Sequence, residues 1–259
     1  MARPRSDAGA PPVKSAARTV ELLEYLARQR GRRSLGDIQS DLGYPKSSLY
    51  VLLQTLVAHG WCETDQTGSL YGLGVRALLA GTSYLDADEV VAAAGAVLDW
   101  LVQATSETVH LARLDGPDVV YLATRESPHY LRPFSRVGRR LPAHATSLGK
   151  ALLAERGDDE VRRLLPHPLP ALTDRTLVTP EDLFPELART RRRGYAVDRE
   201  ENTVGLRCFG VALRLRVPAI DAMSCSVPVA RMTGGRPKEI VAALLTAREK
   251  LEATLGRRP

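Results

Sequence analysis

Apolar side chains recur at helical spacing in several parts of the chain, and the clearest example lies between residues 34 and 60. Leucines stand at positions 49, 52, 53 and 56, which places all four on one face of a helix. A shorter helix is predicted just before it, because Ser34 is a natural N-cap and Gly43 permits the left-handed conformation in which many helices end. Pro45 suits the start of the second helix, and Gly60 follows its end. The pattern therefore predicts two helices joined by a tight turn.

Two short strands are predicted directly after these helices, at residues 61–64 and 69–73, on either side of a turn at residues 65–68. Helix, turn, helix and strand pair in this order make a winged helix-turn-helix. The second helix of such a domain lies in the major groove of DNA. A small helical hairpin without that role can carry the same pattern, so the pattern alone leaves DNA binding open.

The side of the second helix that faces away from the leucines is polar. At about 100° per residue, this side carries Lys46, Ser47, Tyr50 and Gln54. Polar side chains of this kind hydrogen-bond to base edges. Arginines near the end of the first helix and in the next loop are either solvated or in contact with phosphates. The predicted DNA contacts are Arg18, Arg32, Arg33, Ser34, Lys46, Ser47, Ser48, Tyr50 and Gln54.

The rest of the chain changes between helical and strand spacing. The first helix is predicted to turn Ala16, Val20, Leu23 and Ala27 inward. Further helices are predicted at residues 75–85, 88–104, 147–154, 158–165, 180–193 and 237–255. Strands are predicted at residues 108–114, 118–125, 131–137, 206–215 and 220–227. Helices and strands interspersed in this way predict an α+β domain after the helix-turn-helix.

Composition fits an ordinary globular protein. The chain has 259 residues, 44% of them hydrophobic and 25% charged, which is enough for two domains with a buried core. Its net charge of +6 is compatible with a polyanionic partner but does not establish one. Cys62, Cys208 and Cys225 are far apart and lack metal-ligand spacing, so we expect a reducing cytoplasm, no disulfide framework and no metal site. No apolar run approaches the roughly 18 residues of a membrane span, and we expect neither export nor membrane insertion.

The string GYPKSSLYVLL at residues 43–53 and YGLG at residues 71–74 resemble the DNA-binding domain of the IclR-type bacterial transcriptional regulators. That family typically shows GLPKSTVxRLL in its recognition helix and YxLG close to its wing. This chain departs from the pattern at Val51, where the family usually has an arginine, and at Ser69 and Gly72, where basic residues are common. Phosphate binding is therefore expected to move to Lys14, Arg18, Arg32, Arg33 and Lys46.

Three segments of the second half, residues 141–153, 192–208 and 222–228, resemble the effector-binding module of the same family, which has a GAF-like fold. The predicted helix start at Ser147 leaves backbone N–H donors free for an oxygen-rich group. Ser224 and Ser226 alternate with Cys225, so both hydroxyls are expected on one face of a strand. The resemblance implies a ligand pocket lined by Ser147, Leu148, Asp198, Leu206, Cys208, Ser224 and Ser226.

Four of these residues also have an ordinary structural interpretation. Ser224 and Ser226 can be small strand residues that pack under a helix, and Asp198 can bond the backbone of its own turn. Cys208, with no base beside it in the sequence, is more often a buried apolar residue than a nucleophile. Local packing or solvent exposure is expected for His144, Lys150, Arg189 and residues 191–193.

The resemblance implies an α+β protein with a winged helix-turn-helix and a GAF-like effector-binding domain, in which helices flank an antiparallel sheet. We expect a disordered basic tail at residues 1–13, the DNA-binding domain at 14–74, a linker helix at 75–87 and the effector-binding and oligomerisation domain at 88–259. In the tail, Arg3 and Arg5 are either inert or reach DNA phosphates.

The implied function is ligand-responsive transcriptional regulation, in a family with more repressors than activators. The expected partners are a near-palindromic double-stranded DNA operator, a small oxygen-rich effector (a sugar, hydroxy acid or oxo acid) and further copies of the chain in a homodimer or homotetramer. No cofactor, metal or membrane is expected. Two competing functions are an enzyme with Cys208 as nucleophile and His144 or His110 as its base, and a dimerisation scaffold without a ligand. The chain has no nucleophile elbow, phosphate loop or metal-ligand cluster, which disfavours the enzyme.

Overall fold

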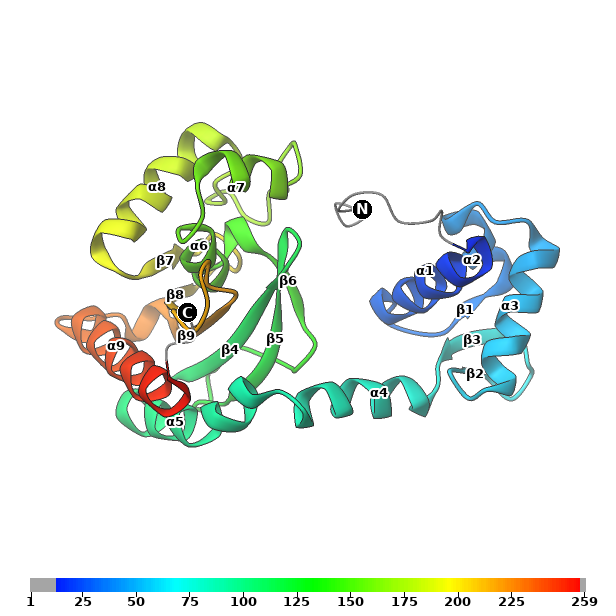
Figure 1. Cartoon of the computed structure of the whole chain (residues 1–259), viewed down its shortest axis with the longest axis horizontal. Helices are drawn as coiled ribbons and strands as arrows, with labels where there is room; N and C mark the ends of the chain where they lie inside the picture. Colours follow the sequence, from blue (N-terminus) through cyan, green and yellow to red (C-terminus); the bar gives the residue numbers. More distant parts are fainter. Residues whose placement is uncertain (1–12, 257–259) are drawn as a thin grey trace. The chain divides into compact units, whose positions relative to one another are not determined.

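The computed structural model describes residues 13–256, and these fall into two compact units that adjoin in sequence at Ala87 and Asp88. Figure 1 shows the elements of both units. Apart from Val13, the disordered tail predicted for residues 1–13, with Arg3 and Arg5, lies outside the described residues. Among the helices of residues 13–256, none is both long enough and apolar enough to cross a membrane.

The N-terminal unit combines four helices with a three-stranded antiparallel sheet. Its helices are α1 (Lys14–Arg28), α2 (Leu35–Leu42), α3 (Lys46–Ala58) and α4 (Val75–Asp86). Its strands are β1 (Arg33–Ser34), β2 (Cys62–Thr64) and β3 (Leu70–Leu73), in the order β1-β3-β2. One core joins α1, α2, α3 and the strands, and its buried members are Leu22, Leu26, Ile38, Leu49, Leu53, Leu56, Cys62 and Tyr71. The predicted winged helix-turn-helix is confirmed.

A capping box defines the start of α2, and a glycine and a proline define the turn between α2 and α3. The Ser34 hydroxyl accepts a hydrogen bond from the Asp37 backbone N–H at 3.2 Å, and the Asp37 carboxylate accepts one from the Ser34 N–H at 3.2 Å. This reciprocal pair is a capping box, which satisfies two N–H groups at the start of α2. Gly43, with φ of 68°, ends α2 in the left-handed region. Pro45 lies at the N-cap of α3, so that helix begins one residue later than predicted.

The inward face of α1 differs from the prediction. Leu22 and Leu26 are buried at 0% and 5% exposure, whereas Val20 is 55% exposed and Ala16 and Ala27 are exposed. The helix carries two overlapping apolar stripes, and the larger leucine side chains bury more apolar area in the core. Of the residues predicted to face inward, Leu23 is half-buried and packs against the core, and the other three were wrong.

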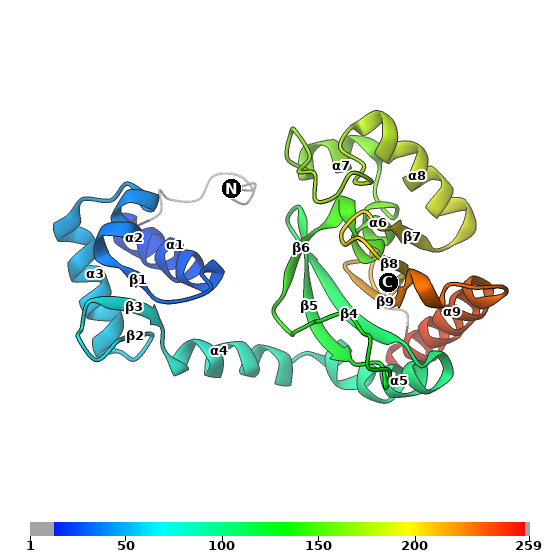
Figure 2. The same ribbon diagram turned by 180° about the vertical axis from the view of Figure 1, so that it is seen from behind.

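The C-terminal unit is a six-stranded antiparallel sheet with helices on both faces. Its strands are β4 (Thr108–Asp115), β5 (Asp118–Arg125), β6 (Arg140–Pro142), β7 (Ala196–Arg199), β8 (Leu206–Leu213) and β9 (Asp221–Pro228), in the order β6-β5-β4-β9-β8-β7. Helices α5 (Glu89–Thr105) and α9 (Arg236–Leu255) pack together on one face. Helices α6 (Ser147–Leu153), α7 (Asp158–Leu164) and α8 (Pro180–Arg193) lie on the other, as Figure 2 shows from behind. The predicted antiparallel sheet flanked by helices is confirmed.

One strand prediction fails in this unit, and two short strands were not predicted. Residues 131–137 form an irregular loop, in which Leu131, Phe134 and Val137 are 63%, 79% and 44% exposed. Pro133 has no N–H to donate to a sheet, which explains why the run does not pair. Strands β6 and β7 were not predicted, because three and four residues are too few to show strand spacing in the sequence.

A partly buried ion-pair cluster ties the start of α5 to the middle of the sheet. The Asp88 side chain caps α5 by accepting from the N–H groups of Val90 and Val91 at 3.0 and 3.1 Å. Arg113 on β4 donates to Asp88 and also, at 2.7 Å, to Asp221 on β9. Because β4 and β9 are the central strands, this cluster anchors α5 to the strands that carry much of the site described below.

Candidate functional sites

The outward side of α3 is polar and exposed, as predicted. Lys46, Ser47, Tyr50 and Gln54 are exposed, while Leu49 and Leu53 on the opposite side are fully buried. Gln54 Nε2 donates to the Tyr71 hydroxyl at 3.4 Å, a long hydrogen bond that leaves most of the amide free. This face, which we call the recognition face, can offer donors and acceptors to base edges.

A second polar surface lies where the start of α1 meets α3. An open groove there is lined by Lys14, Arg18, Ser47 and Ser48, together with Val51, which is 63% exposed. The Arg18 guanidinium lies 4.9 Å from the centre of the Tyr44 ring, a cation–π contact that holds it at the groove. The groove thus places two cations, Lys14 and Arg18, beside Val51, the position at which the family usually has an arginine.

The other three residues predicted to contact DNA form hydrogen bonds or ion pairs within the N-terminal unit. The Ser34 hydroxyl is part of the capping box. Arg33 pairs with Asp41 at 3.3 Å. Arg32 approaches Glu63 at 3.6 Å, and a Cβ on Gly72 would lie 2.9 Å from Arg32 Cγ. Gly72 therefore leaves room for the Arg32 side chain. Arg32 places a cation beside β3, the wing strand that contains Gly72 and has no basic residue.

In the C-terminal unit one cavity is lined by all seven residues of the predicted pocket: Ser147, Leu148, Asp198, Leu206, Cys208, Ser224 and Ser226. These side chains come from α6, β7, β8 and β9. The sequence did not predict Tyr121, Phe134, Arg139, Asn202 and Thr203 as members of the lining, and it named His110 only as a base in the competing enzyme function. Their positions depend on strand pairing and on the loop before β6, which periodicity does not report.

Strand register and two glycines bring these elements together. In the sheet, Cys208 pairs with both Asp198 and Ser226, and Ser224 pairs with His110. The start of α6 lies directly on β8, since a Cβ on Gly210 would come within 2.6 Å of the Ser147 carbonyl oxygen. A Cβ on Gly149 would come within 2.1 Å of the Ala143 carbonyl oxygen, so only glycine allows this approach.

Most of the ionisable groups in the cavity are uncharged. Burial, helped by the charge of Arg139, lowers the pKa of His110 to about 3, so its ring is neutral near pH 7. The His110 ring lies 4.5 Å from that of Tyr121, measured between centroids, and its Nδ1 is 3.5 Å from the Ser224 hydroxyl. Burial also raises the pKa of the Tyr121 phenol and, well above its usual range, that of the Cys208 thiol. Cys208 is therefore a protonated thiol and a poor nucleophile.

Asp198 is the only carboxyl group among the residues that line the cavity. It is 3% exposed, and burial raises its pKa to about 7, with Lys150 opposing and Glu201 adding to the rise. Asp198 Oδ1 accepts a hydrogen bond from the Glu201 backbone N–H at 2.7 Å. The interpretation that Asp198 bonds its own turn is therefore correct, and the same side chain also lines the cavity.

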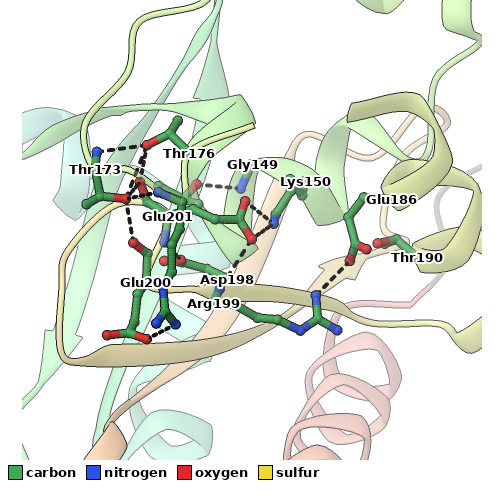
Figure 3. A network of polar contacts seen from close by, with 12 residues as sticks. Gly149, Lys150, Thr173, Thr176, Glu186, Thr190, Asp198, Arg199, Glu200 and Glu201 are labelled. Carbon is green, nitrogen blue, oxygen red and sulfur yellow. Dashed lines mark hydrogen bonds and ion pairs between the residues drawn. The ribbon is translucent and has the colours of Figure 1, made fainter. Parts of the chain in front are cut away.

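Behind Asp198 lies a buried polar network, drawn in Figure 3. Lys150 on α6 donates to both carboxylate oxygens of Glu201, and the two side chains are 0% and 4% exposed. Thr176 Oγ1 donates to the Glu201 carbonyl oxygen at 2.6 Å, and Thr173 Oγ1 to that of Glu200 at 2.7 Å. The prediction that Lys150 lies on a solvated helix face was wrong, because its ion-pair partner is remote in sequence. The network fixes the turn that presents Asp198 to the cavity.

The other residues that were expected to pack locally or to face solvent differ in their contacts. His144 is buried and its Nε2 lies 3.0 Å from the Pro170 carbonyl oxygen, which is local packing. Arg191 reaches the Ala154 carbonyl oxygen at 2.9 Å, and Arg193 pairs with Glu186 at 2.7 Å. Arg191 therefore ties α8 to the end of α6, whereas the ion pair of Arg193 lies within α8. Among residues 13–256, no His, Cys, Asp and Glu side chains gather in a group that could hold a metal ion.

Comparison with known proteins covers both units. A model described as the IclR helix-turn-helix domain matches residues 15–66, and one described as the bacterial transcriptional regulator IclR C-terminal matches residues 82–253. The transcriptional repressor IclR of Escherichia coli (strain K12) is 34% identical over 251 residues, which cover 94% of this chain and 90% of that protein.

Two solved structures extend the comparison to the fold. An IclR transcriptional regulator from Alicyclobacillus acidocaldarius has a TM-score of 0.83 at 26% identity, and the match covers 95% of this chain and 100% of the chain of that regulator. An IclR homolog from Microbacterium hydrocarbonoxydans, complexed with 4-hydroxybenzoate, has a TM-score of 0.76 at 26% identity and covers 93% of this chain and 99% of its own.

Proposed function

The chain belongs to the IclR family of bacterial transcriptional regulators, and on this basis we propose that it is a repressor whose affinity for a near-palindromic operator is set by a small oxygen-rich effector. Members of the family are transcriptional regulators rather than enzymes, with a DNA-binding helix-turn-helix and an effector domain. The relative from Escherichia coli is a repressor by name, which favours repression over activation. One observation carries the proposal: a partly open cavity, lined by polar and apolar side chains, in a unit attached to a winged helix-turn-helix.

For operator recognition we assign the recognition face to base contacts and the groove of α1 and α3 to phosphate contacts. Tyr50 and Gln54 extend further than Ser47 and, unlike Lys46, offer both donors and acceptors. Lys14 and Arg18 are the cations of the groove. Arg33 contributes less, because Asp41 already neutralises it. Lys46, Ser47, Ser48 and Arg32 complete the proposed surface.

For the effector we assign the cavity around Asp198. Its lining mixes hydroxyls, a thiol, a carboxyl and neutral rings, which suits a sugar, a hydroxy acid or an oxo acid. The homolog complexed with 4-hydroxybenzoate supports a ligand with a carboxylate and a hydroxyl group in this family. An effector has to prefer one DNA-binding geometry by only about 1–3 kcal/mol to change operator occupancy.

For assembly we propose a homodimer or homotetramer formed in part through α4. This helix has no buried residue in the described part of the chain, yet Val75, Leu78 and Leu79 share one face and are 59%, 64% and 58% exposed. Apolar faces of this kind mark interaction sites. Two copies are also needed to hold two recognition helices on a near-palindromic operator.

Ligand-dependent DNA binding tests the proposal. Thermal-shift screening of the full-length protein against small metabolites should find one that stabilises it. The same compound should change operator affinity, whereas Asp198→Ala and Ser224→Ala proteins should bind the operator but not respond. If both variants respond at the wild-type effector concentration, the pocket is wrongly assigned. Operator affinity that no metabolite changes would favour the scaffold without a ligand.

A further inference from the structure

An exposed apolar side chain lies in the middle of the outward side of α3. Val51 is 63% exposed, although valine is among the residues that proteins most often bury. At about 100° per residue, the buried Leu49 and Leu53 lie about 160° from Val51 around the helix axis. The exposed Ser47 and Gln54 lie on the same side as Val51, about 40° and 60° away. Val51 therefore points away from the core and borders the recognition face.

The surroundings of Val51 suit DNA better than an apolar protein surface. Val51 lines the open groove of α1 and α3 together with Lys14, Arg18 and Ser47. An apolar partner would strip water from both cations without pairing them, whereas a DNA backbone offers them phosphates. Ser47 belongs to both the groove and the recognition face, so Val51 lies where the proposed phosphate and base contacts meet.

The Val51 side chain cannot hydrogen-bond to a base. On the next turn of α3, Thr55 donates its hydroxyl proton to the Val51 carbonyl oxygen at 2.8 Å, so this proton is used within the helix. Among the four unmodified bases, thymine alone presents a methyl group in the major groove. An apolar side chain favours one base over the others by covering this methyl group and removing it from water.

We propose that Val51 is a specificity-determining residue that contacts the 5-methyl group of one thymine in each half of the operator. This inference rests on the operator recognition proposed above and adds an apolar contact to its hydrogen bonds. Burial of one methyl group corresponds to about fourfold in affinity. The two half-sites together should contribute about fifteenfold, since separate contacts add in free energy.

Deoxyuridine tests the proposal, because it differs from thymidine only in lacking the methyl group. The probe is the duplex that the full-length protein selects from a random pool, with each thymine replaced in turn by uracil. Affinity is measured by fluorescence anisotropy. At one thymine in each half-site the replacement should weaken binding of wild type by about fourfold. Val51→Ala should bind the thymine duplex more weakly than wild type and should not distinguish thymine from uracil at this position.

A matched variant and the salt dependence isolate the contact. Val20→Ala changes a valine of α1 that is 55% exposed and lies outside the groove lining, and it should respond to each uracil as wild type does. The ratio of thymine to uracil affinity should be the same at low and at physiological salt, because the contact is apolar, whereas phosphate contacts weaken with salt. Thermal unfolding of Val51→Ala should occur no lower than that of wild type, because alanine favours a helix.

The outcomes separate this contact from operator recognition as a whole. If wild type is indifferent to every uracil, or Val51→Ala shows the same loss as wild type, the contact is overturned and operator recognition is left intact. A selected site without a thymine overturns the contact in the same way. If the pool yields no duplex that wild type binds more tightly than a scrambled one, the result counts against both proposals.

Discussion

Replacement of Lys150 by methionine removes the only cation within 4.0 Å of the Glu201 carboxylate in the described part of the chain. The Glu201 side chain is 4% exposed, so water cannot replace the lost ammonium group. One other hydrogen bond to this carboxylate remains, from the Arg199 backbone N–H at 3.2 Å. Breaking a buried ion pair from one side typically costs about 3–5 kcal/mol, because the partner charge stays buried. We therefore expect Lys150→Met to destabilise the C-terminal unit by about this amount.

Urea denaturation measures the effect. The chain has two tryptophans, so a Trp61→Phe background leaves Trp100, in α5, as the fluorescence reporter of the C-terminal unit. Lys150→Met with Glu201→Gln should recover most of the loss, because no charge is then left buried. The control Lys238→Met changes an exposed lysine and should cost within about 0.5 kcal/mol. A cost of Lys150→Met as small as that of Lys238→Met, or no recovery in the double variant, would refute the reasoning.

Three further predictions concern DNA, pH and assembly. Tyr50→Ala and Gln54→Ala should each weaken the specific operator complex by about 1–3 kcal/mol and leave binding to random duplex unchanged; equal losses on both duplexes in a competition assay would remove these residues from base recognition. Burial raises the pKa of Asp198 from an ordinary 3.8 to about 7. Between these two pH values the folded state therefore keeps a proton on Asp198 that the unfolded state has lost. The free energy of unfolding of wild type should therefore fall, relative to Asp198→Asn, as pH rises from about 4 to 7, by at most on the order of 4 kcal/mol; parallel stability curves of the two proteins would contradict this. Leu79→Asp, on the exposed face of α4, should lower the mass measured by light scattering towards the 28.3 kDa of one chain, and an unchanged oligomer would place the interface elsewhere.

Local sequence patterns predicted most elements of the fold but not all of their faces. Ser34 and Gly43 determine the ends of α2 by short-range hydrogen bonds and backbone conformation, so a single sequence contains the information. The inward face of α1 depends on which of two apolar stripes meets the core, and this is decided by α2, α3 and the wing. The strand predicted at residues 131–137 had suitable side chains, but Pro133 prevents regular pairing.

The residues of the cavity also divide into those that the sequence predicted and those that it did not. Its seven predicted residues lie in segments that resemble the family, and the structure brings all of them to one lining. The resemblance said nothing of Arg139, and periodicity cannot show that a loop residue faces His110 and Tyr121. Lys150 looked like a surface lysine because its partner, Glu201, is 51 residues away in the chain. Long-range pairing of charges is the part of a site that a single sequence does not show.

The central claim is that this protein recognises a specific duplex and that a ligand in the Asp198 cavity changes that recognition. The most direct test selects binding sites from a pool of random duplexes with the full-length protein, and then measures affinity by fluorescence anisotropy with and without a compound found by thermal shift. We predict a near-palindromic site, bound at least about 10³-fold more tightly than a scrambled duplex at physiological salt. We also predict that the compound changes the affinity of wild type and not of Asp198→Ala. Equal affinity for the selected and scrambled duplexes, or an equal response of both proteins, would contradict the account.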